Sequence, residues 1–191
     1  LEVPQECLIL TMKSNQKYFP IVDHENKLTN QFIIVSNLTP FNPKIIIEGN
    51  EKVIRPRFAD AEFFFKQDKK NTLLEMSHKL DKIIYHNKLG SQSDRAKRVS
   101  KIHQHIYQEL SIGDFKDFER IALLAKADLV SLMVGEFPEL QGTMGRYYAL
   151  NSNEDISIAD AIEDHYKPKF SGDTLPRSIL GVTFSLADKF E

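Results

Sequence analysis

Four basic side chains cluster in the segment that follows the turn at 89–91. They are Arg95, Lys97, Arg98 and Lys101. Cations that reach one rail of nucleic-acid backbone bind its phosphates, and free N–H groups at a helix N-terminus assist. Arg55 and Arg57 form a smaller cluster on either side of Pro56. Such clusters can contact nucleic-acid phosphates, and the alternative is an ordinary solvated face.

Composition sets limits on these interpretations. The chain has 191 residues, 41% of them hydrophobic, and a net charge of −2, so a nucleic-acid contact requires a local patch. A single cysteine, Cys7, excludes an internal disulfide framework and fits a reducing cytoplasm. No apolar run is long enough for a membrane, and no secretory signal is expected at the start. Both ends have the character of cuts from a longer chain.

A second unusual segment concentrates residues that restrict or free the backbone. Gly135, Glu136, Pro138, Gly142 and Gly145 fall within eleven positions. Proline suits the first turn of a helix, and an acidic residue is favourable near the positive end of a helix. We expect a helix that opens at Pro138, with the last two glycines on one face where a second helix approaches. The segment is therefore predicted to be a structural clamp.

Enzymatic signatures are missing. The phosphate-loop pattern GxxxxGK[ST] does not occur. Cys7 has no reactive motif beside it, and Ser91 is a helix N-cap candidate without a neighbouring base. We expect no catalytic residue in this chain.

The elements that position these residues form an α+β arrangement. Residues 1–71 are predicted to hold the strands: the apolar runs 7–13 and 31–37 form a hairpin around the polar cluster at 23–26, and 44–47 adds a short strand. Pro56 is expected in the first turn of a helix that buries Phe58, Ala61 and Phe65.

Residues 72–191 are predicted to form an all-helical domain. Helices are expected over 93–110, 118–132 and 156–166, and a fourth begins at Pro176. In the first of these helices Ala96, Val99 and Ile102 face inward, which leaves Lys97, Arg98 and Lys101 on the outer side.

Long, ordered motifs resemble the beta subunit of the bacterial tetrameric glycyl-tRNA synthetase. They include ECLILTMKSNQKYFP, EGNEKVIRPRFADAEFFFKQD, KADL, GEFPELQGTMGRYYA, AIEDHYKP and SLADKFE, and they cover nearly the whole chain. The family's beta subunit is much longer, so the resemblance implies an internal fragment. It also implies two partners, the alpha subunit and tRNA(Gly). No cofactor is implied for the fragment, because the alpha subunit houses the aminoacylation centre and uses the ATP.

The same resemblance implies an HD-like helical domain in 72–191, truncated at its C-terminus. In the HD phosphohydrolase fold a His, an adjacent His-Asp pair and a later Asp bind a metal. Here His86, Ala127-Asp128 and Asp188 stand at those positions. Ala127 replaces an imidazole ligand, and ligands must converge within ~2.0–2.2 Å. We therefore expect no metal centre.

The remaining candidates have simpler interpretations. Asp128 lies on or beside an apolar helix face and is expected to accept hydrogen bonds from backbone or a basic partner. His86 is expected at a packed helix end and His165 at a helix end before Pro168. His103 and His105 stand two apart on a helix, cannot share a metal, and are expected to be solvated.

Two functions from different classes compete. The leading one is a non-catalytic part of glycine–tRNA ligase that binds tRNA and scaffolds subunits, with assembly on alpha as a variant. The alternative is an HD-type metal-dependent phosphohydrolase, which Ala127 disfavours.

Overall fold

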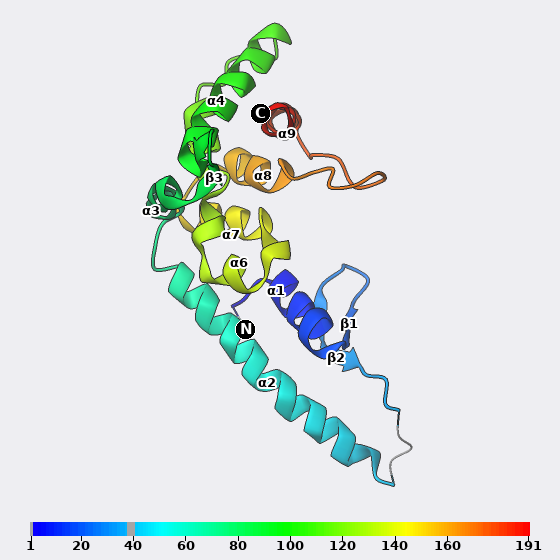
Figure 1. Cartoon of the computed structure of the whole chain (residues 1–191). Coiled ribbons are helices and arrows are strands. Elements are labelled where there is room, and N and C mark those ends of the chain that lie inside the picture. Colours follow the sequence, from blue (N-terminus) through cyan, green and yellow to red (C-terminus); the bar gives the residue numbers. More distant parts are fainter. Residues whose placement is uncertain (1, 38–40) are drawn as a thin grey trace. The chain divides into compact units, whose positions relative to one another are not determined.

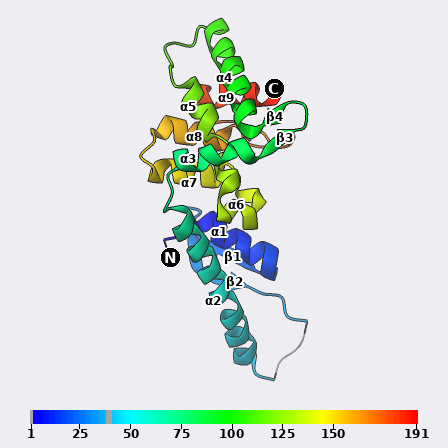
Figure 2. The ribbon, with the colours of Figure 1, turned by 60° about the vertical axis from the view of Figure 1, so that its left-hand side comes forward.

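The chain folds into a small unit with a two-stranded sheet and a larger helical unit, which confirms the α+β class. The computed structural model describes residues 2–37 and 41–191 (Figures 1 and 2). The boundary between the units lies between Gln67 and Asp68. Within the described residues, no helix is long and apolar enough to cross a membrane.

In the first unit a hairpin and a short helix share a core with one long helix. Its elements are α1 (Gln5–Leu10), the π-helical turn η1 (Thr11–Asn15), β1 (Phe19–Val22), β2 (Leu28–Ile33) and α2 (Pro43–Asp68), whose last residue belongs to the second unit. Met12, Tyr18 and Ile54 form the core of this unit. The Tyr18 ring stacks on Phe32 at 4.9 Å between centroids, and its hydroxyl donates to Asn50 at 2.6 Å.

Three sequence predictions for this unit are wrong. Residues 7–13 are helical, 44–47 lie in α2, and Pro56 is inside α2 and not in its first turn. A short apolar run suits either a strand or a helix. In the helical form, Cys7 and Thr11, four residues apart, lie on one face and are both buried.

The second unit is a set of helices around a buried apolar centre, drawn from green to red in Figure 1. Its first elements are α3 (Leu73–Ser77), η2 (His78–Lys82), β3 (Ile84–His86), β4 (Gly90–Ser91) and α4 (Gln92–Glu109). The others are α5 (Phe118–Leu124), η3 (Ala127–Val130), α6 (Leu132–Glu136), η4 (Pro138–Leu140), α7 (Thr143–Asn151), α8 (Ile156–Asp164) and α9 (Ile179–Phe190). Helix α4 packs against α5 and α9, and α8 packs against α7 and α9.

Some predicted features of this unit are confirmed, and others have different bounds. Ser91 is the N-cap of α4, as expected, and its hydroxyl accepts from the Asp94 N–H in a capping box. The helix expected over 118–132 is broken into α5 and η3, and α6 begins at Leu132. The last helix begins at Ile179, not at Pro176, because Ser178 caps it. The β3–β4 hairpin was not predicted, and it places His86 on an exposed strand.

His103 is buried, contrary to the sequence prediction. Its ring lies among Phe115, Phe118 and Phe184, and its Nε2 is 3.0 Å from the Thr183 hydroxyl. Burial lowers the pKa of His103 to about 4. This histidine is therefore a neutral core residue.

Two buried carboxylates cap the short helices from a distance. The Asp128 Oδ2 accepts the N–H groups of Gly142 (2.6 Å) and Gly145 (3.0 Å) at the start of α7. Asp68 does the same for α6, accepting the N–H groups of Leu132 (2.8 Å) and Met133 (3.0 Å). The first N–H groups of a helix have no partner within it, so these carboxylates satisfy donors that would otherwise be buried unpaired.

The glycine segment differs from the expected clamp. Pro138 opens only the three-residue 3₁₀ turn η4, so no helix runs from Pro138 through both glycines. Gly142 is the N-cap of α7 with φ 81°, a backbone conformation that favours glycine. A Cβ on Gly145 would lie 2.8 Å from Ile162 of α8 and 3.1 Å from Asp128 Oδ2. Gly135 and Glu136 are exposed at the end of α6.

We expect Gly145→Ala to lower the free energy of unfolding by about 1–3 kcal/mol, because the added methyl group overpacks the α7–α8 contact. Gly135→Ala is the matched control: a Cβ there meets nothing within 4 Å. Alanine in a helix should stabilise the protein by roughly 0.4–1 kcal/mol. Urea unfolding measures both variants, and equal effects of the two would contradict the packing argument.

We also expect a pH signature from Asp128. Burial raises the pKa of Asp128 to about 6, against the opposing effect of the two glycine N–H groups. The folded state then holds a proton that the unfolded state has released between about pH 4 and 6, so ionisation of Asp128 costs stability as the pH rises through this window.

From pH 4 to 7, the free energy of unfolding of the wild type should therefore fall by on the order of 1–3 kcal/mol relative to that of Asp128→Asn. Urea unfolding of both proteins across this range measures it. A difference that stays constant with pH would mean that Asp128 is ionised throughout.

Candidate functional site

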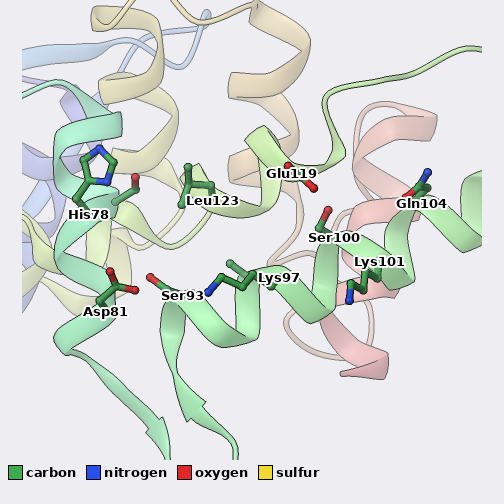
Figure 3. Close-up of a pocket in the computed structure, with 11 residues that line it drawn as sticks. His78, Asp81, Ser93, Lys97, Ser100, Lys101, Gln104, Glu119 and Leu123 are labelled. Atoms are coloured by element: carbon green, nitrogen blue, oxygen red, sulfur yellow. The ribbon is translucent and has the colours of Figure 1, made fainter.

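A groove with several polar and charged side chains in its lining runs beside α4 in the second unit. Its volume is about 650 Å³. One wall carries a stripe of α4 side chains spaced so that they share a helix face: Ser93, Lys97, Ser100, Lys101 and Gln104. The other walls come from α3, η2 and α5, as Figure 3 shows.

The groove mixes charges of both signs. Lys97 and Lys101 are exposed on α4, whereas Asp81 of η2 and Glu119 of α5 supply carboxylates from the other walls. Lys97 Nζ lies 3.6 Å from Asp94, a weak, exposed pair. Lys101 has no hydrogen bond or ion pair to any residue that the structure describes. Two cations are therefore available to an anionic ligand.

The four cations that the sequence places together fall into two groups in the structure, the arginines Arg95 and Arg98 and the lysines Lys97 and Lys101. Arg95 donates to Glu191 at 2.7 Å and to the Asp188 carboxylate at 2.8 Å, and its side chain is 11% exposed. Arg98 donates to Glu191 at 2.7 Å and to the Leu89 carbonyl at 2.8 Å. These two arginines hold α4 to the end of α9 and to the β-hairpin, while the two lysines line the groove.

Arg55 and Arg57 belong to the first unit. Both are exposed on α2, where Arg55 pairs with Glu51 at 3.5 Å and Arg57 with Asp60 at 3.8 Å. Their contact with RNA stays a prediction.

Comparison with known proteins places this arrangement in a family. A family model described as "Glycyl-tRNA synthetase beta subunit" matches residues 1–191. Curated relatives named glycine–tRNA ligase beta subunit are 60% identical in Nitrosomonas eutropha, 59% in Delftia acidovorans and 58% in Janthinobacterium sp.. Each alignment covers 100% of this chain and 27% of the relative. The chain belongs to the glycyl-tRNA synthetase beta subunit family. It spans about a quarter of the length of these relatives.

In this beta-subunit segment, the residues at the metal-binding positions of the HD phosphohydrolase fold have other environments. His86 is exposed on β3, Ala127 is fully buried, and Asp128 is bound to backbone N–H groups. Asp188 accepts from Arg95 and from Lys126, whose Nζ is 3.3 Å away. In the described ranges 2–37 and 41–191, no group of three or more His, Cys, Asp or Glu residues could hold a metal ion.

Lys126 is a largely buried cation in this part of the beta-subunit segment. Its Nζ lies over the Tyr166 ring, 4.0 Å from the centroid, and burial lowers its pKa. His165 is also buried and its Nδ1 is 2.6 Å from the Ile162 carbonyl at the end of α8. The phosphohydrolase alternative gains no support here, since Asp188 is already neutralised by cations of the chain itself.

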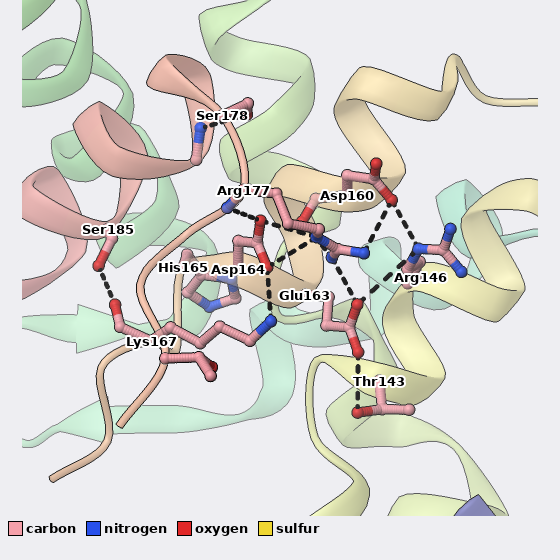
Figure 4. Close-up of polar contacts among 12 residues, drawn as sticks. Thr143, Arg146, Asp160, Glu163, Asp164, His165, Lys167, Arg177, Ser178 and Ser185 are labelled. Atoms are coloured by element: carbon pink, nitrogen blue, oxygen red, sulfur yellow. Dashed lines mark hydrogen bonds and ion pairs between the residues drawn. The ribbon is translucent and has the colours of Figure 1, made fainter. Parts of the chain in front are cut away.

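A second ionic network, not found from the sequence, fixes the segment before α9 (Figure 4). The Arg177 N–H donates to Asp164 at 2.7 Å, and its guanidinium bridges Asp160 and Asp164. Lys167 pairs with Asp164 at 2.9 Å. Burial opposes ionisation, but Arg177 and Lys167 hold the pKa of Asp164 below its ordinary value. These groups are all mutually satisfied, so the network is structural.

The groove hydroxyls of Ser93 and Ser100 were also missed. Both serines belong to a polar stripe along α4 whose residues follow one another at spacings of four, three, one and three. That spacing was the signal available in the sequence.

We expect Arg95→Ala to lower the free energy of unfolding by about 1–3 kcal/mol, because it leaves Asp188 and Glu191 with fewer cationic partners in a largely buried place. Lys97→Ala removes the same charge two residues along α4 from an exposed side chain, and should change stability by less than about 0.5 kcal/mol. Urea unfolding measures both. Similar losses in the two variants would show that Arg95 does not brace α4.

Proposed function

We propose that this chain is a tRNA-binding and scaffolding part of the beta subunit of glycine–tRNA ligase. The enzyme attaches glycine to tRNA(Gly) with ATP in the cytoplasm, and the alpha subunit supplies the aminoacylation centre and uses the ATP. In this proposal the chain contributes no catalytic residue and no cofactor site, and its partners are tRNA(Gly) and the alpha subunit.

The observation that carries the proposal is the position of Lys97 and Lys101. Both line the same groove on a helix whose other two basic side chains, Arg95 and Arg98, are held against α9 and the hairpin. The lysines lie one helical turn apart and can address neighbouring phosphates of a strand. Such contacts fix the register of the RNA and carry no base sequence.

The test uses the full alpha–beta enzyme with Lys97→Ala and Lys101→Ala combined. We expect the KM for tRNA(Gly) to rise roughly 5- to 30-fold, about 1–2 kcal/mol, with glycine activation unchanged. A plot of the logarithm of the tRNA binding constant against the logarithm of salt concentration should have a slope that is smaller in magnitude by about one per lysine removed. Aminoacylation kinetics and pyrophosphate exchange measure these quantities.

The matched control is Lys82→Ala combined with Lys116→Ala, which removes equal charge from exposed positions outside the groove. It should leave the KM for tRNA close to wild type. An unchanged KM at low salt in the groove variant, or an equal rise in the control, would reject phosphate contact by the groove.

A further inference from the structure

The groove contains two hydroxyls that the protein itself does not use. Ser93 and Ser100 are 8% and 6% exposed, and both line the groove. Neither hydroxyl has a hydrogen bond within the part of the chain that the structure describes, whereas the neighbouring Ser77 hydroxyl donates to the Leu74 carbonyl at 2.7 Å. Nearly buried hydroxyls are normally paired. Both side chains line the open groove, where water or a ligand can supply the partners.

The carboxylates argue against a groove that binds phosphate alone. Asp81 and Glu119 line it from the walls facing α4, and in Figure 3 the Ser100 hydroxyl is directed toward the wall that carries Glu119. A carboxylate near a phosphate costs binding energy through like-charge repulsion, yet it is a good acceptor for a hydroxyl donor. The groove therefore fits a ligand that alternates anionic groups with hydroxyls.

The ribose–phosphate backbone of RNA has this alternation. Its phosphates can meet Lys97 and Lys101, and its 2′-hydroxyls can both donate and accept hydrogen bonds. DNA offers the phosphates without the hydroxyls. Serine hydroxyls match the dual character of the 2′-hydroxyl, and Glu119 matches its donor character.

We propose that the α4 groove reads the 2′-hydroxyls of an RNA strand through Ser93, Ser100 and Glu119, while Lys97 and Lys101 hold its phosphates. This inference rests on the proposed function and deepens it, since it makes the groove selective for RNA over DNA at the strand that it holds.

The experiment is 2′-deoxy interference on the full alpha–beta enzyme. A pool of tRNA(Gly) transcripts, each with a few random 2′-deoxy substitutions, is divided into bound and unbound fractions. With wild type we expect the bound fraction to be depleted of 2′-deoxy substitutions, at least threefold, at a short run of nucleotides. Ser93→Ala combined with Ser100→Ala should abolish that depletion, and Glu119→Gln should weaken it.

The control is Ser111→Ala combined with Ser171→Ala, two exposed serines outside the groove, which should retain the wild-type pattern. Serine to alanine favours a helix, so the groove variant should fold. Urea unfolding of the variant checks this independently. A cross-check is affinity for the unsubstituted transcript, which the serine variant should lower only about 2- to 10-fold.

The outcomes separate the two proposals. If the serine variant keeps the wild-type depletion while the lysine variant still raises the KM, the groove binds phosphate and does not read ribose. If neither variant changes tRNA binding, both proposals fail. If both variants instead weaken association of alpha with beta, measured by sedimentation, the groove is a protein interface and the RNA assignment is overturned.

Discussion

The helical unit depends on one buried carboxylate. Gly142, the N-cap of α7, has no side chain to cap the helix, and the Asp128 carboxylate from η3 accepts the N–H groups of Gly142 and Gly145 instead. The bond joins segments fourteen and seventeen residues apart in sequence. It requires a backbone with no Cβ at Gly145, where Ile162 and Asp128 both approach. The packing of α7 on α8 thus follows from the capping of α7.

This constraint also determines what the region can do chemically. The Asp128 Oδ2 accepts two backbone N–H groups, whereas its Oδ1 is buried and has no hydrogen-bond partner among the described residues. Ala127 beside it is fully buried, and Lys126 before it pairs with Asp188. The three consecutive residues 126–128 therefore all make contacts within the unit. The side chains that are available to a ligand lie elsewhere, on the face of α4 that lines the groove.

Helix α4 packs into the interior of the unit with one face and lines the groove with another. The apolar face, with Ala96 and Val99, is buried against α5 and α9. One flank is held by Arg95 and Arg98, and the other opens into the groove. A helix that is fixed along one flank holds the backbone of the groove residues in place, which lowers the entropic cost of binding a strand.

The sequence predicts those parts of the structure that depend on local periodicity. Helix α4, its Ser91 cap and the availability of Lys97 and Lys101 follow from spacing and capping chemistry. Short apolar runs such as 7–13 were assigned to strands because their length does not distinguish the two elements.

The burial of His103 could not be predicted locally, since it results from Phe118 and Phe184 on other helices. The same holds for the groove. Its α4 wall can be read from the sequence, but the carboxylates that face it come from η2 and α5, and only tertiary packing brings them to one place. A count of charge along α4 therefore suggests a phosphate surface, whereas the assembled walls indicate a site that also offers partners to hydroxyls.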